Sequence, residues 1–467
     1  MIFASLLFLF AFLPLFLAGY YALPWIGARN LFLTLASYGF YAWSIPKYVP
    51  LMLVSTAIDW FVALRIEAAP DPRVRRRWLV VSMVTNLALL GWFKYANLGV
   101  ELLRDLTGQP FAGWVAIVLP VGISFYTFQS MSYTIDVYRN EVKPVRSFLD
   151  LACYVSMFPQ LVAGPIVRYH DVQLQVRNRA HAVAPFARGI VHLALGLAKK
   201  VLIADNAALL VDVTFASAVP GSGVEPGLLD AWLATLAYSI QIYFDFSGYS
   251  DMAIGLGLMT GFRFPSNFLS PYRSESITEF WRRWHVSLST WLRDYLYVPL
   301  GGNRHGSLRT YVNLSLTMLL GGLWHGAAYN FVLWGAYQGA WLVVERLAGK
   351  RPLWHFLPHP LRVFVTMLVV LGGWVLFRAS SLGNLGSMGK GMLGLNGLGA
   401  LPVPTGHPLE AWLAVVLGLG IAWTMPRTET LAARFSLRVV VWAVVVALLA
   451  LGQLASRQHS PFIYFQF

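Results

Sequence analysis

Cysteine and charge are both scarce in this chain. Of its 467 residues one is a cysteine, Cys153, and only 12% carry a charge, whereas 57% are hydrophobic. A single cysteine excludes an intramolecular disulfide framework, a zinc site built from a cysteine cluster and an iron–sulfur centre. Soluble domains are about a quarter charged, and a folded soluble chain cannot bury so large a share of apolar side chains. The composition therefore predicts an all-α polytopic membrane protein.

Common cofactor and catalytic motifs are also missing. The sequence has no P-loop, no Rossmann glycine pattern, no G-x-S-x-G elbow and no H-E-x-x-H zinc motif. We therefore expect no bound cofactor and no metal ion.

The positive charge is spread along the chain. A net charge of +14 raises the question of a nucleic-acid partner, but no RNA- or DNA-binding module is present, and we expect none. In a membrane protein, lysine and arginine mark cytoplasmic loops and contact anionic headgroups. The alternative is that some of the arginines bind an anionic substrate.

The N-terminal segment is apolar and its first cation is Arg29, so we expect a retained first span and no cleaved signal peptide. An arginine cluster follows the third candidate span, which places the N-terminus outside the cytoplasm. The cluster consists of Arg65, Arg73, Arg75, Arg76 and Arg77.

Apolar runs predict roughly 11 to 14 transmembrane, re-entrant and interfacial helices in a single membrane domain. The candidate segments are Ile2–Leu23, Leu31–Ile45, Val49–Ile66, Trp78–Phe93, Trp114–Ile135, Phe148–Gly164, Pro185–Ile203, Leu228–Phe246, Met252–Phe262, Tyr311–Trp324, Ala327–Val344, Leu361–Phe377, Leu409–Trp423 and Val439–Leu454. Within the domain (1–467) we distinguish N-terminal helices (1–262), cytoplasmic interfacial helices (263–309), broken helices (310–347), C-terminal helices (348–454) and an aromatic tail (455–467).

The segment Ser276–Pro299 predicts one helix at the bilayer surface. Ser276 and Glu279 form a capping box at its start, and Pro299 ends it. One face is rich in tryptophan and the opposite face carries arginines, as an interfacial helix requires. The apolar face holds Trp281, Trp284, Leu288, Trp291, Leu292, Tyr295 and Leu296, and the polar face holds Arg282, Arg283, Ser287, Thr290, Arg293 and Asp294.

Two histidines stand out. His285 falls within the apolar stripe, where a low dielectric keeps an imidazole neutral, and either a structural or a catalytic role is open. His325 lies between apolar runs in the sequence GGLWHG, and an ionisable residue at membrane depth indicates function. Its glycines disfavour a continuous helix, and Gly326 leaves room for a substrate beside the ring. Catalysis is the favoured role of His325, and a structural role and metal ligation are the alternatives.

Two acids and one tyrosine are further candidates. Asp245 and Asp251, in the stretch YFDFSGYSD, either orient a histidine or form structural ion pairs with arginines of the surface helix. The C-terminal sequence SPFIYFQF either anchors at the interface or enters a cavity, where Tyr464 would carry an acyl group to the histidine.

With these motifs the sequence resembles the membrane-bound O-acyltransferase superfamily, and within it the bacterial alginate O-acetylation proteins. The resemblance runs from about residue 2 to residue 378 and rests on the motifs Phe280–His285 (FWRRWH), Ser289–Leu296 (STWLRDYL), Leu300–Arg304 (LGGNR), Gly321–Gly326 (GGLWHG), Tyr243–Gly257, Lys94–Asn97 (KYAN), Leu119–Tyr126 (LPVGISFY) and Ala163–Pro165 (AGP). The resemblance becomes weaker over the glycine-rich residues 380–406.

The resemblance implies tilted helices around a central funnel, with His325 and His285 as the catalytic histidines. It also implies a multi-pass protein of the bacterial cytoplasmic membrane, which moves an acetyl group from cytoplasmic acetyl-CoA to a polysaccharide such as alginate. A periplasmic or extracellular acetyltransferase is an implied partner. The tail resembles an acyl-carrying aromatic motif of teichoic acid D-alanylation, which would make Tyr464 a carrier.

Acyl transfer to a hydroxyl needs a base and stabilisation of an oxyanion. We expect neutral His325 to be the base, and His285 to orient it, relay the proton or polarise the carbonyl. Arg282 and Arg283 either meet the phosphates of coenzyme A or bind headgroups. The alternatives are D-alanyl or other acyl transfer to teichoic acid or another glycan, a transporter of acyl groups or lipid-linked sugars without chemistry, and a scaffold.

Overall fold

The computed structural model describes residues 1–108, 113–162, 164–218, 225–349, 352–404 and 406–457, and these residues form helices and loops without a β-strand. The chain packs into two compact units. The first consists of Met1–Leu193 and Met252–Pro265, and the second of Ala194–Asp251 and Ser266–Phe467. The all-α class predicted from composition is confirmed.

The first unit contains α1 (Leu13–Ala22), α2 (Ile26–Ala42), α3 (Val49–Ala68), α4 (Pro72–Thr107), α5 (Ile123–Tyr138), α6 (Phe148–Ser156), α7 (Phe158–Leu161), α8 (Tyr169–Arg177) and most of α9 (Val183–Ala198), with the short η1 (Phe8–Phe12) and η2 (Pro46–Tyr48). The last turns of α11 (Leu228–Met259) also belong to it.

The second unit contains the rest of α11, then α10 (Asp205–Ser217), α12 (Ile277–Arg283), α13 (Val286–Leu292), α14 (Gly306–His325), α15 (Tyr329–Leu347), α16 (His359–Arg378), α17 (Leu382–Met392), α18 (Pro408–Thr424), α19 (Thr428–Arg434) and α20 (Leu437–Arg457). Three short elements, η3 (Lys199–Ala204), η4 (Pro271–Arg273) and η5 (Arg293–Tyr297), also lie in this unit.

Several helices are long and apolar enough to cross a bilayer. Among the described residues four qualify by length and composition: Pro46–Ala68, Pro72–Thr107, His359–Arg378 and Leu437–Arg457. The pair α18 and α19, bent by 70°, adds a fifth if it forms one span. The other helices are shorter or more polar, which fits the expectation that some segments cannot cross alone.

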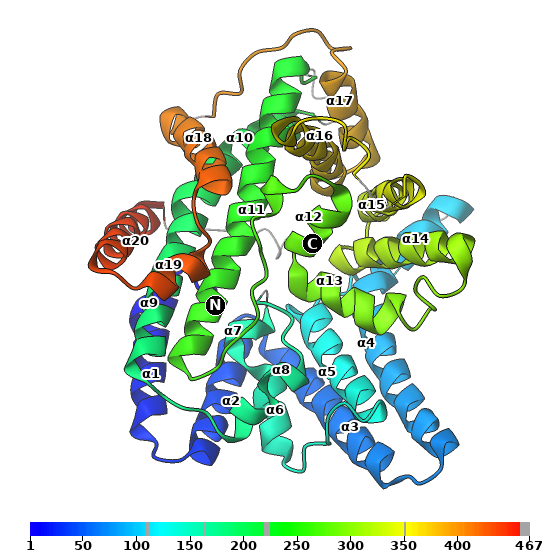
Figure 1. Ribbon diagram of the computed structural model, residues 1–467, viewed down its shortest axis with the longest axis vertical. Coiled ribbons are helices and arrows are strands. Elements are labelled where there is room, and N and C mark those ends of the chain that lie inside the picture. Colours follow the sequence, from blue (N-terminus) through cyan, green and yellow to red (C-terminus); the bar gives the residue numbers. More distant parts are fainter. Residues whose placement is uncertain (109–112, 163, 219–224, 350–351, 405, 458–467) are drawn as a thin grey trace. The chain divides into compact units, whose positions relative to one another are not determined.

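Buried hydrogen bonds join α3, α4 and α5, which lie side by side (Figure 1). Asp59 of α3 accepts hydrogen bonds from Ser82 at 2.6 Å and from Asn86 at 2.9 and 3.0 Å, both on α4. The Ser82 hydroxyl also lies 3.0 Å from that of Thr134 on α5. These four polar side chains thus have partners within the bundle, which satisfies groups that would be costly to bury alone.

His170 of α8 lies between two carboxylates in the first unit. Its Nδ1 is 3.3 Å from Asp136 and its Nε2 is 2.9 Å from Asp171. These hydrogen bonds, the one to Asp136 first, raise the pKa of His170 to about 9. The imidazolium form is therefore favoured in the folded protein at neutral pH.

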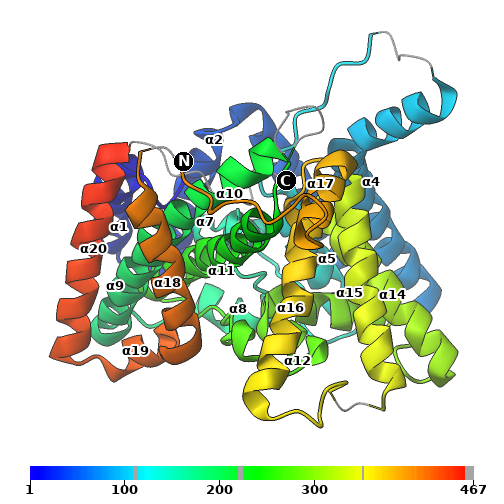
Figure 2. The ribbon, with the colours of Figure 1, turned by 90° about the horizontal axis from the view of Figure 1, so that it is seen from above.

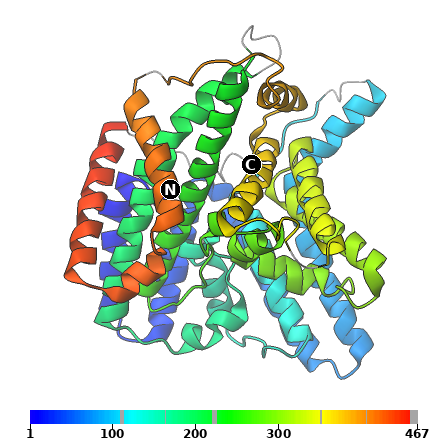
Figure 3. The same ribbon diagram turned by 45° about the horizontal axis from the view of Figure 1, so that its top comes forward.

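The helices α14 and α15 form a closely packed antiparallel pair, beside which α16 lies (Figures 2 and 3). A Cβ on Gly322 would lie 2.2 Å from the carbonyl oxygen of Phe331, and one on Gly335 would lie 2.6 Å from that of Met318. Only glycine permits this backbone approach. The prediction that the glycines near His325 disfavour a regular helix is therefore wrong, because α14 continues through Gly321 and Gly322 to His325.

Two other predicted boundaries are corrected. The segment predicted as Trp114–Ile135 becomes helical only at Ile123, because Gly122 adopts a left-handed conformation (φ +76°) where a Cβ would lie 2.6 Å from the Leu161 carbonyl oxygen. The predicted pair Leu228–Phe246 and Met252–Phe262 is one helix, α11. Its Gly248 does not break it, and serves close packing against the Gly196 carbonyl oxygen, 2.7 Å from an added Cβ.

Candidate active site

The predicted helix Ser276–Pro299 is broken at His285. The Ser276 hydroxyl accepts from the Glu279 amide at 3.1 Å, which confirms the cap, while the Glu279 carboxylate accepts from the amide of Glu275 at 2.8 Å. The helix α12 ends at Arg283, and α13 begins at Val286. His285 between them has φ +43° and ψ +53°, a left-handed conformation that is uncommon for a residue other than glycine. Such strain costs on the order of 1–3 kcal/mol and clusters at functional sites.

A neighbouring loop supplies the hydrogen bonds that the break removes from the helix. The Val286 amide donates to the carbonyl oxygen of Asn267 at 2.9 Å, and the Leu269 amide donates to that of Arg283 at 2.9 Å. The exchange leaves the backbone on both sides of His285 satisfied, so the left-handed turn is held on both sides.

The His285 side chain is 1% exposed and packs edge-on against Phe246, with ring centroids 4.6 Å apart. Its Nδ1 lies 3.1 Å from Oδ1 of Asn267. Its Nε2 is buried, and among the described residues no group hydrogen-bonds to it. Burial lowers the pKa of His285 to about 3, so the ring is neutral at pH 7.

His325 is the last residue of α14, and the backbone leaves the helix at Gly326. The ring is 6% exposed, and Trp334 and Phe377 contact it with centroid distances of 5.1 and 5.2 Å. The centroids of His285 and His325 lie 6.4 Å apart. Residues forty positions apart in sequence thus form one pair of buried imidazoles, within the second unit.

The space at the Gly326 Cα is filled by a neighbouring side chain. A Cβ added to Gly326 would lie 2.1 Å from the ring of Phe331. The prediction that Gly326 leaves room for a substrate is therefore wrong, because the missing side chain makes room for this aromatic ring of α15.

The tryptophan-rich side of α12 and α13 is also buried within the protein. Trp281 is 9% exposed and Trp284 is 2% exposed. Trp281 contacts Trp334, and Trp284 contacts Trp374 with centroids 4.8 Å apart. The expectation that this stripe faces a bilayer is wrong, because α15 and α16 cover it and the break at His285 ends the continuous helix.

The two candidate arginines have different surroundings. Arg283 forms an ion pair with Glu279 at 2.5 Å, which leaves it less suited to an outside anion. Arg282 is exposed and lines a cavity of about 450 Å³. The cavity is also lined by Ser276, Thr278, Glu279, Tyr297, Thr310, Leu314, Leu342, Glu345, Arg346 and Pro352.

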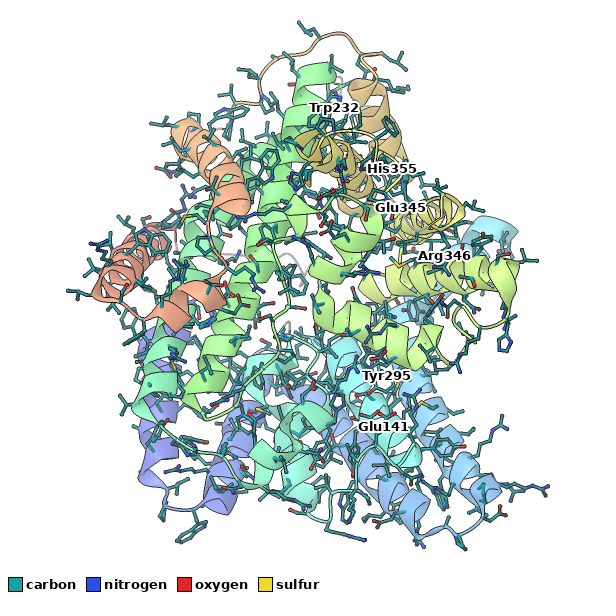
Figure 4. The ribbon with its side chains drawn as sticks, in the orientation of Figure 1. Glu141, Trp232, Tyr295, Glu345, Arg346 and His355 are labelled. Carbon is teal, nitrogen blue, oxygen red and sulfur yellow. The ribbon has the colours of Figure 1, made fainter. Side chains whose placement is uncertain are left out.

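The carboxylates of this cavity are occupied. Glu345 of α15, labelled in Figure 4, accepts from the amides of Ile277 and Thr278 at 2.6 and 2.8 Å and so caps α12. The side chain of Arg346 beside it, also labelled, makes no hydrogen bond or ion pair within the described part of the chain. The lining thus holds two acids and two arginines, but both carboxylates are already bound by other groups, which leaves the N–H groups of the arginines available to an anion.

Asp245 and Asp251 form ion pairs with lysines of η3. Asp245 pairs with Lys200 at 2.9 Å, and both side chains are 2% exposed. Lys200 also pairs with Asp205, and Asp251 pairs with Lys199 at 2.6 Å. These contacts favour a structural role for both acids, with lysines of η3 as partners in place of the predicted arginines.

Tyr464 lies outside the described residues. Within the described ranges, no group of three or more histidine, cysteine or acidic side chains is placed to hold a metal ion.

Sequence reasoning missed Asn267. Its hydrogen bond to His285 spans 18 positions that include η4 and α12, and no periodic pattern signals such a contact.

These features define a multi-pass membrane enzyme of helical fold with a buried histidine pair. The family model of membrane-bound O-acyltransferases matches residues 140–351. The chain is 51% identical to "Probable alginate O-acetylase AlgI" of Pseudomonas aeruginosa over 387 residues, which cover 82% of this chain and 73% of the relative. It is 43% identical to the protein of the same name from Pseudomonas putida over the whole of both chains.

A third relative is the peptidoglycan O-acetyltransferase of Helicobacter pylori, which is 39% identical over 431 residues that cover 85% of this chain and 81% of the relative. The chain belongs to the membrane-bound O-acyltransferase family, and it is an O-acyltransferase.

Proposed function

We propose that this protein moves an acetyl group from cytoplasmic acetyl-CoA across the bacterial inner membrane for the O-acetylation of an extracytoplasmic polysaccharide such as alginate. The observation that supports it best is the pair of buried imidazoles, His285 and His325, with centroids 6.4 Å apart. The names of the relatives suggest acetyl as the transferred group and alginate as the acceptor polymer. A periplasmic or extracellular acetyltransferase that completes the transfer belongs to the proposal.

His325 acts as the general base in this proposal. The acceptor hydroxyl oxygen bonds to the acetyl carbonyl carbon, and the bond from that carbon to sulfur breaks. The hydroxyl proton passes to the histidine pair and leaves with the thiolate, so that free thiol and acetyl ester are the products. A neutral imidazole is the form that can accept this proton, and water-free surroundings protect the thioester.

The cavity beside Arg282 is the proposed site for the phosphates of the donor. Arg282 and Arg346 supply positive charge and N–H donors for the phosphate oxygens. The bound carboxylate of Glu345 does not compete for the arginines, because three groups of α12 already hold it.

The test replaces His325 with alanine in the cell that makes the polymer. The acetyl content of the surface polysaccharide is measured by mass spectrometry, and we expect loss of acetylation at normal levels of folded membrane protein. His355→Ala, at an exposed histidine (Figure 4), is the matched control and should leave acetylation unchanged. Normal acetylation in the His325→Ala strain would contradict the proposal.

A second arm separates an enzyme from a transporter. Purified protein in detergent, where no second compartment exists, should release free thiol from acetyl-CoA when an acceptor is added. Absence of thiol release together with acetyl movement across vesicles would favour the transporter.

A further inference from the structure

Asn267 links His285 by hydrogen bonds to α11 and α13 of the second unit. It is 1% exposed, and its Nδ2 donates to the hydroxyl of Ser250 on α11 at 3.2 Å. Its Oδ1 accepts from the amide of Ser287 at 3.3 Å and from the Ser287 hydroxyl at 2.9 Å. The same oxygen faces Nδ1 of His285 at 3.1 Å.

The orientation of this amide group is determined by a backbone donor. An amide oxygen and nitrogen are hard to tell apart by shape, so their assignment must come from the hydrogen bonds. The backbone N–H of Ser287 can only donate, and therefore the atom of Asn267 that faces it must be the oxygen. The Nδ2 end then points to Ser250, whose hydroxyl can accept.

The tautomer of His285 follows from this orientation. An amide oxygen can only accept, so Nδ1 of His285 must carry the proton. The alternative has the Ser287 hydroxyl donating to a bare Nδ1 at 3.5 Å, which is longer than its 2.9 Å bond to Asn267. That alternative would also set two lone pairs against each other at 3.1 Å. With Nδ1 protonated, the neutral ring has its lone pair on Nε2.

We propose that Asn267 is a positioning residue that holds His285 in the Nδ1–H tautomer, so that Nε2 is a proton acceptor within the histidine pair. The inference rests on the proposed function and deepens it. Nε2 of His285 is a buried atom that no described group satisfies, as expected of a position that a substrate proton completes. The main chain of Asn267 adds to this, since its carbonyl oxygen binds the Val286 amide and holds the left-handed turn at His285.

The assignment decides among the roles that the sequence left open for His285. A neutral ring with a bare Nε2 has no proton to give from that atom, so it cannot polarise the acetyl carbonyl. It can relay the proton that His325 takes from the acceptor hydroxyl, and the resulting imidazolium is stabilised through Nδ1–H by the oxygen of Asn267. The proton then departs with the thiolate, and the neutral tautomer returns.

The first experiment reads the tautomer without any activity. The protein is labelled with ¹⁵N-histidine in lipid nanodiscs, and the His285 signals are identified by subtracting the spectrum of His285→Gln. At pH 7 we expect a protonated Nδ1 and an unprotonated Nε2. A protonated Nε2, in either the neutral or the cationic ring, would overturn the proposal even if the protein acetylates normally. If His285 has the expected tautomer but the protein releases no thiol from acetyl-CoA, the inference about Asn267 stands and the proposed function is refuted.

The second experiment measures rates of thiol release from acetyl-CoA. Asn267→Ala should lower kcat by about 10²- to 10³-fold, within the range of lost acid–base assistance, and change KM by less than about twofold. Asn267→Asp keeps an acceptor for Nδ1–H and should recover most of the rate. Its negative charge favours the imidazolium and should move the acidic limb of the rate–pH profile to higher pH.

Asn313 of α14 is the matched control, because it is also 1% exposed and its amide binds the carbonyl oxygen of Gly302 at 2.9 Å. Asn313→Ala should lower the yield of folded protein and leave kcat and the pH profile of the folded fraction unchanged. If Asn267→Ala behaves in the same way, or if Asn267→Asp leaves the acidic limb in place, Asn267 is only structural and the proposal fails.

Discussion

Replacement of Lys200 by methionine tests whether the buried acids are structural. Lys200 and Asp245 are each 2% exposed and 2.9 Å apart. Removal of one partner leaves a buried carboxylate without its cation, which costs about 3–5 kcal/mol, or a factor of roughly 10² to 10³·⁵ in the unfolding equilibrium. Asp205, the second partner, is 15% exposed and keeps some contact with solvent, so Asp245 carries most of the penalty.

The free energy of unfolding is measured by denaturing detergent in mixed micelles. The double variant Lys200→Met and Asp245→Leu removes both charges, and we expect it to recover most of the loss, because an apolar pair of similar volume is often neutral. Arg104→Met is the control, since its pair with Asp105 is 59% and 52% exposed and is worth about 0–1 kcal/mol.

Two results would refute this reasoning. One is a loss below about 1 kcal/mol in Lys200→Met, a magnitude typical of exposed pairs. The other is an Asp245→Asn protein that is as stable as the wild type and yet loses acetylation, which would return Asp245 to the catalytic machinery.

Three further predictions follow from the structure. Gly326→Ala should destabilise the protein by about 1–3 kcal/mol in the same unfolding assay through overpacking against Phe331, and a variant as stable as the wild type would show that the site has spare room. Arg282→Ala and Arg346→Ala should each raise KM for acetyl-CoA at nearly constant kcat in the thiol assay, whereas an unchanged KM in both would remove the donor from that cavity. Because the pKa of His170 is raised to about 9, its ion pairs add stability that is fully present below pH 6.5 and is lost as the pH rises through 9. In thermal unfolding, His170→Gln should abolish this pH-dependent loss of stability. A wild-type melting temperature that stays constant from pH 6 to 10 would contradict the prediction.

Sequence patterns predicted the helical class and the two histidines, because composition and isolated ionisable residues are local signals. They failed where a long-range contact decides the backbone. The amphipathic pattern of residues 276–299 is continuous, and the break at His285 depends on hydrogen bonds from the loop at Asn267. Glycine was misjudged for the same reason, since Gly322 and Gly248 are packing positions for neighbouring helices and do not interrupt their own.

The candidate site was predictable in its residues and less so in its arrangement. His285 and His325 could be named from their surroundings in the sequence, but the direction of the His285 ring could not, because it depends on one amide oxygen. Arg346 was also missed. Its place beside Arg282 depends on how the end of α15 meets α12, which no spacing along the chain encodes.

The central claim is that His285 and His325 act as one unit on the acceptor hydroxyl. The most direct test is the rate of acceptor-dependent thiol release from acetyl-CoA by His285→Ala, His325→Ala and the double variant, each compared as folded protein. Residues that work together lose their contributions together, so the double variant should be no slower than the slower single variant. Two independent losses that multiply in the double variant would contradict the account.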